Sequence, residues 1–144
     1  MAQTIDQAKT GGFENVAVIG FGLIGASFAA ALRGANPSAQ VMAVDTDLAT
    51  RVEAVNRGWA TATAAPDAAE FRAFIEDGCD LVVLATPVSV VEGYLKDLAE
   101  WDYRGIITDT ASTKSRIIEM AAYTLPYPQN FVPGHPMAGS EKNG

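Results

Sequence analysis

The sequence has little of several residue types that would indicate common functions. It contains one cysteine, Cys79, so no disulfide can form within the chain, and this fits a reducing cytoplasm. It contains one histidine, His135, and no cluster of histidine, cysteine and acidic residues at metal-ligand spacing. We therefore expect no metal site and no Cys–His catalytic pair.

Positive charge and long apolar runs are also scarce. Lysine and arginine total 10 against 17 aspartates and glutamates, which gives a net charge of −7 with no basic cluster. This balance argues against nucleic acid and anionic membranes as partners. No apolar run approaches the roughly 20 residues of a membrane helix, and the N-terminus lacks the apolar core of a signal peptide. The sequence predicts a cytoplasmic protein.

The composition is that of a globular domain. The chain has 144 residues, of which 49% are apolar, enough for one domain with a substantial core. Residues 1–13 are polar and are predicted to form a disordered tail, and residues 14–144 to form the domain.

Short apolar runs alternate with helical patterns along the chain. Expected strands are 15–20, 40–45, a weak edge strand at 59–64, 80–87, 104–109 and 129–134. Expected helices are 23–34, 47–58, 66–78 with Pro66 in its first turn, 88–101, and 112–125. This alternation predicts an α/β fold, a doubly wound parallel sheet of about six strands typical of Rossmann dinucleotide-binding domains. Ligands of such sheets bind beyond the carboxyl ends of the strands.

The first expected strand ends in a G-x-G-x-x-G motif. Gly20 permits a tight turn, Gly22 lets the backbone approach a pyrophosphate, and Gly25 lets the following helix pack closely. Glycines also mark ordinary turns, but this motif follows a strand, opens a helix and precedes an acidic residue by twenty positions. The predicted cofactor-binding turn comprises Gly20, Phe21, Gly22, Leu23, Ile24 and Gly25.

Asp45 is that acidic residue. At the end of the second strand, it can accept hydrogen bonds from both hydroxyls of the adenosine ribose and would repel a 2′-phosphate. Thr46 and Asp47 follow, with no arginine there to pair such a phosphate, so the sequence favours NAD over NADP. Asp47 is also expected to cap the next helix.

Two further segments follow the fourth and fifth expected strands. Ala85, Thr86 and Pro87 either leave room for a cofactor ribose or form an ordinary turn, with Thr86 near the helix cap. Ser112 either caps a helix or faces a ligand.

His135 follows the last expected strand on the predicted nicotinamide side. A lone histidine is usually structural, but hydride transfer from an alcohol requires a proton acceptor near neutral pH. Glu141 could orient the imidazole or be an ordinary surface acid.

Four segments together resemble a known family. "GFGLIGAS", "LATPV", "DTASTK" and "HPMAGSEKNG", in that order, are similar to the N-terminal NAD-binding domain of prephenate and arogenate dehydrogenases. The glycine motif is generic, whereas "HPMAGSE" preceded by D-x-x-S-x-K is far more specific. The resemblance implies NAD-dependent oxidation and decarboxylation of prephenate to 4-hydroxyphenylpyruvate, in tyrosine biosynthesis.

The resemblance also implies residue roles. His135 would accept the proton of the substrate's 4-hydroxyl, Ser112 would lie close to that hydroxyl and the nicotinamide, and Glu141 would join the polar network. Family members carry a C-terminal helical domain that forms a homodimer and supplies basic residues for the substrate's carboxylates. Without it, we expect this chain to bind NAD but to oxidise prephenate weakly or not at all. Arogenate oxidation and a non-catalytic NAD-binding module are the alternatives.

Overall fold

The computed structural model describes residues 12–111 and 114–134. The strands are β1 (Asn15–Ile19), β2 (Gln40–Val44), β3 (Ala62–Ala64), β4 (Leu81–Leu84), β5 (Ile106–Asp109) and β6 (Phe131–Val132). The helices are α2 (Leu23–Ala35), α3 (Leu48–Asn56), α4 (Ala69–Glu76), α5 (Val88–Glu100) and α6 (Lys114–Thr124), with a 3-10 turn, η1, at Pro128–Asn130.

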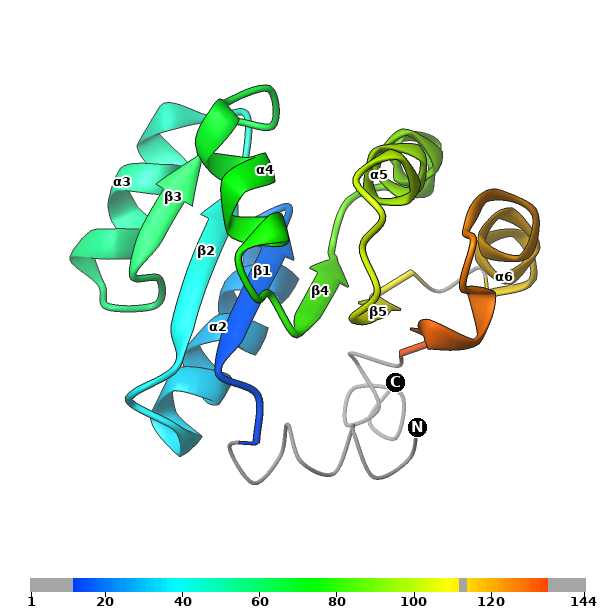
Figure 1. Cartoon of the computed structure of the whole chain (residues 1–144). Coiled ribbons are helices and arrows are strands. Elements are labelled where there is room, and N and C mark those ends of the chain that lie inside the picture. The colour runs from blue at the N-terminus through cyan, green and yellow to red at the C-terminus, as the bar shows by residue number, and fades with distance from the viewer. Residues whose placement is uncertain (1–11, 112–113, 135–144) are drawn as a thin grey trace, which may run out of the picture.

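These strands form one parallel sheet in the order β3-β2-β1-β4-β5-β6, which can be followed across Figure 1. The predicted doubly wound α/β fold is confirmed. Strand order reverses between β1 and β4, because the chain first builds outward through β2 and β3 and then returns to the other side of β1. This reversal is the switch point at which such sheets bind ligands.

The strands are buried on both faces, as their continuous apolar runs indicate. In β1, Ala17 and Ile19 belong to a core shared with α4, α5 and α6, whereas Val16 and Val18 belong to a core shared with α2 and α3. Successive side chains of a strand point to opposite faces, so one short run supplies two cores. The sheet is thus the middle layer of three.

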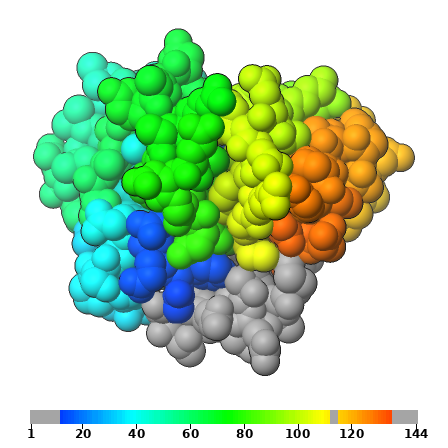
Figure 2. Space-filling model, viewed as in Figure 1, coloured from blue at the N-terminus to red at the C-terminus, as the bar shows by residue number. Residues whose placement is uncertain are grey.

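Phe71 of α4 is the largest fully buried side chain. Its ring lies edge-on to Trp101 at 5.2 Å and to Tyr94 at 6.4 Å between centroids. Figure 2 shows the resulting surface, on which α4 in green lies against the yellow end of α5. Burial of such a side chain stabilises a fold by about 1.5–3 kcal/mol, so this contact ties α4 to α5 on one face of the sheet.

Helix α4 begins later than predicted. Pro66 was expected in its first turn, but the helix begins at Ala69. The N–H of Ala68 donates to the carbonyl of Ala65 at 3.0 Å, which places Pro66 second in a four-residue turn. Proline favours that position because its φ is already fixed near the value required. The proline therefore forms the turn before the helix.

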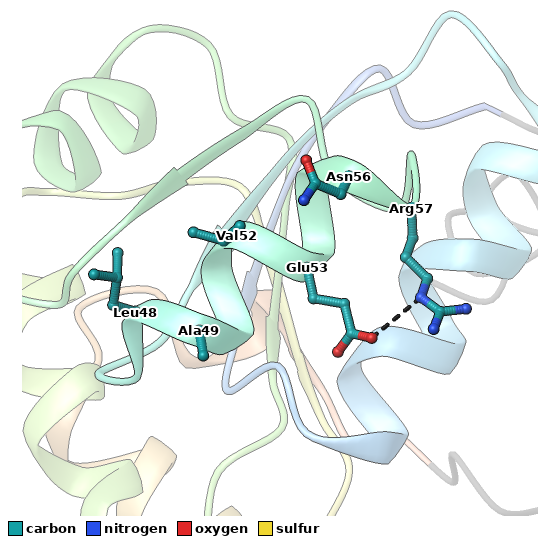
Figure 3. Close-up of a pocket in the computed structure, with 6 residues that line it drawn as sticks. All are labelled: Leu48, Ala49, Val52, Glu53, Asn56 and Arg57. Atoms are coloured by element: carbon teal, nitrogen blue, oxygen red, sulfur yellow. Dashed lines mark hydrogen bonds and ion pairs between the residues drawn. The ribbon is translucent and has the colours of Figure 1, made fainter.

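The apolar residues of α3 face outward. Leu48, Val52 and Val55 recur at helical spacing, and the helix is confirmed, but these side chains are 65%, 49% and 46% exposed. Figure 3 shows Leu48 and Val52 beside a shallow surface hollow on this helix. The buried residue of α3 is Ala54. Helical periodicity thus identified the helix but not the face that packs.

Two single residues complete the comparison with the sequence. Phe13, assigned to the predicted tail, is 4% exposed and packs in the core with α2 and α3, whereas Gly12 is exposed and residues 1–11 lie outside the described residues. Cys79 is a buried free thiol whose pKa is raised to about 12, chiefly by desolvation. It therefore stays protonated and unreactive. In the described part of the chain, no helix is long and apolar enough to span a membrane.

Candidate cofactor site at the carboxyl edge of the sheet

The turns after β1, β4 and β5 all start where the carboxyl ends of the parallel strands lie side by side, here called the carboxyl edge of the sheet. Backbone hydrogen bonds fix their first residues. The Gly20 N–H donates to the Val44 carbonyl at 2.8 Å, and the Ala85 N–H to the Ile19 carbonyl at 2.7 Å. The Thr110 N–H donates to Leu84 O at 3.0 Å. The strand ends predicted to bind a ligand are therefore neighbours in space.

Gly20 is required by both its conformation and its surroundings. Its φ is +90°, a value that side chains disfavour. A Cβ there would lie 2.7 Å from the carbonyl oxygen of Ala85 and 2.8 Å from Cγ2 of Thr86. The glycine turn and the turn after β4 are thus in direct contact, which joins two segments that the sequence analysis assigned to cofactor binding.

The other two glycines differ sharply in their surroundings. A Cβ on Gly25 would overlap the carbonyl oxygen of Gly20 and lie 3.2 Å from Val18 Cγ1, so α2 can start close to the turn only with glycine there. A Cβ on Gly22 would meet nothing within 4 Å. Gly22 is the N-cap of α2 and provides no side-chain cap. The open space at Gly22 therefore lies beside the backbone N–H groups at the start of α2, which no side chain caps. Phosphate binding requires both features.

The apolar members of the motif have separate positions. Phe21 is 3% exposed and packs in the core with α2 and α3, whereas Leu23 is 85% exposed. Ile24 is half-buried. Phe21 contributes to the site through its backbone N–H, which donates to Asp45.

Asp45 links the glycine turn to the start of α3. Its Oδ2 accepts from the N–H of Phe21 at 2.8 Å and its Oδ1 accepts from the N–H of Asp47 at 2.9 Å. A carboxylate can accept about four hydrogen bonds, so these two leave capacity for ribose hydroxyls. The side chain is half-buried and held in place before any ligand arrives.

Asp47 caps α3, as predicted. Its carboxylate accepts from the N–H of Thr50 at 3.0 Å and from the Thr50 hydroxyl at 2.6 Å. The hydroxyl bond is the largest cause of a lowered pKa of Asp47, and the nearby Arg51 contributes to it. The first turn of α3 therefore carries an ionised cap at neutral pH.

Arg51 is a residue that sequence reasoning missed. Its Nη1 donates to the backbone carbonyl of Asp45 at 2.7 Å, and the side chain is half-buried. The sequence contains no arginine immediately after Asp45, but one helical turn brings Arg51 back to the same strand end. A search for arginines one turn into α3 would have found it.

The turn after β4 contains an unusual polar atom. Thr86 Oγ1 is buried and has no hydrogen-bond partner within the described part of the chain. Helix α5 has Pro87 as its N-cap and no side-chain cap, so Thr86 does not cap it. A buried hydroxyl without a partner is costly unless a ligand supplies one.

The end of β5 carries a buried carboxylate. Asp109 is 2% exposed, and its Oδ2 accepts from the N–H of Ala111 at 2.9 Å. Its Oδ1 accepts from the N–H of Gly134 at 3.2 Å. Asp109 is the first residue of the D-x-x-S-x-K motif, and the sequence predicted no role for it. The three predicted catalytic residues, Ser112, His135 and Glu141, lie outside the described residues.

Comparison with known proteins agrees with this geometry. Residues 28–144 match the family described as "Prephenate dehydrogenase, nucleotide-binding domain". The chain is 34% identical over 137 residues to a prephenate dehydrogenase of Lactococcus lactis and 33% identical over 134 residues to one of Bacillus subtilis. Each alignment covers 91% of this chain, but only 36% and 34% of the two relatives. This chain therefore spans little more than a third of their length.

A solved structure is similar as well. The prephenate dehydrogenase of Aquifex aeolicus, crystallised with hydroxyphenyl propionate and NAD⁺, superposes with a TM-score of 0.76 at 27% identity. The match covers 88% of this chain and 42% of that one. The sequence motifs, the fold and both comparisons lead to one conclusion: the chain belongs to the prephenate dehydrogenase family, of which it represents the nucleotide-binding domain.

Proposed function

We propose that this chain binds NAD at the carboxyl edge and provides the cofactor half of an enzyme that oxidises and decarboxylates prephenate. The observation that carries the proposal is the contact between Gly20 and the Ala85–Thr86 turn, with Asp45 bonded to the N–H of Phe21. Three chain segments far apart in sequence meet there, each with a group suited to a dinucleotide.

The residues present fit NAD. The open space at Gly22 and the uncapped start of α2 suit a pyrophosphate. Asp45 has acceptor capacity for the adenosine ribose, and Thr86 Oγ1 is a buried hydroxyl that lacks a partner in the described chain. Each of these groups would gain a hydrogen bond or an ionic contact from the cofactor.

Bound NAD would supply the hydride acceptor, and side chains of this chain would bind the substrate's hydroxyl and accept its proton. In this proposal His135 accepts the proton of the substrate's ring hydroxyl, and Ser112 binds the same hydroxyl. Glu141 belongs to the surrounding polar network. Loss of carbon dioxide makes the ring aromatic, which drives the reaction towards 4-hydroxyphenylpyruvate. These three roles rest on the family's motifs.

Preference for NAD over NADP rests on Asp45. Its half-buried carboxylate would face the 2′-position of the ribose, where a phosphate would be repelled. Arg51 is the opposing influence, because its guanidinium lies at the same strand end and has N–H groups beyond the one that donates to Asp45 O. We propose that the carboxylate dominates, since its two backbone hydrogen bonds hold it between the turns.

Titration of the chain with NADH and NADPH, followed by nicotinamide fluorescence, tests cofactor binding. NADH should bind more tightly than NADPH. If neither cofactor binds, the proposed function is wrong. If NADPH binds more tightly than NADH, only the proposed preference for NAD through Asp45 is wrong.

Prephenate oxidation tests the chemistry. NADH formation should be measured with the chain alone and with a separately supplied helical domain of the family, for wild type and His135→Asn. We expect activity that depends on His135. Activity retained in His135→Asn would remove His135 from the mechanism. Cofactor binding without turnover in either mixture would favour a non-catalytic NAD-binding module, and faster turnover of arogenate would change the substrate.

Two wider predictions follow from the resemblance and the composition. A homodimer is expected for the family's two-domain enzymes, and a cytoplasmic location fits a single reduced cysteine. Sedimentation of the purified protein and fractionation of the source cells would test them.

A further inference from the structure

Thr108 and Asp109 are the buried polar side chains of the described residues, and both lie at the end of β5. Burial of a carboxylate is costly unless hydrogen bonds replace its water. Asp109 accepts from Ala111 N–H at 2.9 Å and from Gly134 N–H at 3.2 Å, one bond to each oxygen. The two donors are 23 residues apart in sequence, so the carboxylate bridges two separate segments.

The bridge forms where the β5–β6 ladder stops. Ile107 pairs with Phe131 and Thr108 with Val132, so the next residue opposite Asp109 is Pro133. Beyond Pro133, the N–H of Gly134 donates to the Asp109 side chain. The carboxylate thus holds the chain that follows β6 against the end of β5.

Gly134 also requires its small size. A Cβ there would overlap the carbonyl oxygen of Asp109 and lie 2.7 Å from Thr108 Oγ1. The backbone of this segment therefore lies directly on the end of β5. Any larger residue would push the segment away from the strand and from the Asp109 carboxylate.

The two bridged residues each precede a residue that the sequence analysis assigned to catalysis. Ser112 follows Ala111, and His135 follows Gly134. Adjacent Cα atoms are about 3.8 Å apart, so the bridged residues set the starting point of the next residue in each segment. We propose that Asp109 is a positioning residue, whose buried carboxylate fixes the spacing of the two segments that lead into Ser112 and His135. This inference rests on the proposed function.

Only an acceptor with two oxygens can make this bridge. Asparagine at the same position keeps the shape, but it replaces one oxygen with an NH₂ donor that would face a backbone N–H. Asp109→Asn should therefore release one of the two segments.

Asp80 provides a matched control at the opposite edge of the sheet. Its two carboxylate oxygens accept from Glu14 N–H at 3.0 Å and Asn15 N–H at 3.1 Å. Asp80→Asn likewise removes one oxygen from a carboxylate that accepts one backbone N–H on each oxygen, with the same change in net charge, but far from the cofactor site. General loosening of the fold should appear in both variants, whereas loss of positioning should appear only in Asp109→Asn.

The single histidine makes the experiment direct, because its ring-proton NMR signal needs no assignment among several. Saturating NAD⁺ should shift the His135 signal in wild type and in Asp80→Asn. In Asp109→Asn the shift should be largely lost, while NAD⁺ affinity changes by less than about threefold. Gly134→Ala, which disturbs the bridge from its other side, should behave like Asp109→Asn and serves if that variant does not fold. A full shift in the bridge variants, or an equal loss in Asp80→Asn, would overturn the proposal.

Failure of the proposed function would be recognised separately, because wild type would then not bind NAD⁺. The bridge would then be tested by amide hydrogen exchange in the free protein. Exchange at Ala111 or Gly134 should be about tenfold faster in Asp109→Asn than in Asp80→Asn, as expected when a hydrogen bond is lost. Equal exchange in the two variants would overturn the inference.

Discussion

The amino ends of the strands lie at the opposite end of the sheet, here called the amino edge. There, Asp80 accepts hydrogen bonds from the N–H groups of Glu14 and Asn15, which anchors the start of β1 beside the start of β4. At the carboxyl edge, Asp45 and Asp109 do the same for the turns after β1, β2, β5 and β6. Each of the three carboxylates accepts from at least one backbone N–H that is distant from it in sequence. The carboxyl edge also has a glycine turn with open space beside Gly22 and, in contact with that turn, the buried Thr86 hydroxyl, which lacks a partner in the described chain.

The difference between the edges shows how one interaction serves two purposes. A carboxylate that satisfies two backbone N–H groups stabilises any strand end. At the switch point, the same groups also fix the positions of turns to which a ligand can bind. Substitutions at the two edges should therefore separate stability from cofactor binding.

Gly25→Ala should produce the largest effect. The added methyl group overlaps the carbonyl oxygen of Gly20, so either α2 or the glycine turn must move. We expect a stability loss of about 1–3 kcal/mol from overpacking and NADH affinity lower by about tenfold or more. Thermal unfolding and NADH fluorescence would measure these effects.

Gly34→Ala is the matched control, in the same helix. A Cβ on Gly34 meets nothing within 4 Å, so alanine should leave NADH binding unchanged and stabilise the helix by about 0.5–1 kcal/mol. Equal losses in Gly25→Ala and Gly34→Ala would contradict the role given to Gly25.

Asp45→Asn should rank second. The amide keeps one acceptor but loses the charge and one backbone bond, so NADH affinity should fall by about tenfold. The difference between the NADH and NADPH affinities should become smaller, because repulsion of the 2′-phosphate disappears while Arg51 remains. Asp77→Asn, an equal charge change at the exposed end of α4, should alter neither affinity. Unchanged discrimination in Asp45→Asn would show that another residue selects the cofactor.

Asp80→Asn should reduce stability without affecting the cofactor. Loss of one of its two backbone hydrogen bonds should lower the free energy of unfolding by about 1–2 kcal/mol, measurable by urea denaturation. NADH affinity should equal that of wild type at temperatures where the variant is folded. Weaker NADH binding would show that the amino edge also shapes the cofactor site.

The Asp47 cap should give the smallest effect, visible through pH. The folded-state pKa of Asp47 lies below its ordinary value of 3.8, mainly because of the Thr50 hydroxyl. Its contribution is therefore present above the unfolded pKa and is lost as pH falls through the lowered folded pKa. Asp47→Asn keeps a cap that does not titrate. As pH falls from neutral to about 3, the melting temperature of wild type should therefore fall relative to that of Asp47→Asn. A difference that stays constant with pH would contradict the assignment.

Local sequence patterns predicted much of the fold. The apolar runs identified all six strands of the described sheet, including the weak edge strand β3, and the Asp47 cap was correct. Two predictions failed where the local pattern allows two outcomes. Pro66 fits both a first helical turn and the preceding four-residue turn. The stripe of Leu48, Val52 and Val55 fits either face of α3.

The candidate site divides in the same way. The sequence by itself determined the glycine turn, the acidic residue at the end of β2 and the alternation of helices with parallel strands. Local backbone conformation and strand burial depend directly on residue type and spacing. Only the tertiary structure decided that the Asp109 carboxylate bridges Ala111 to Gly134. That contact depends on the pairing of β5 with β6, which brings together residues 25 positions apart, and no local sequence pattern predicts such a pairing.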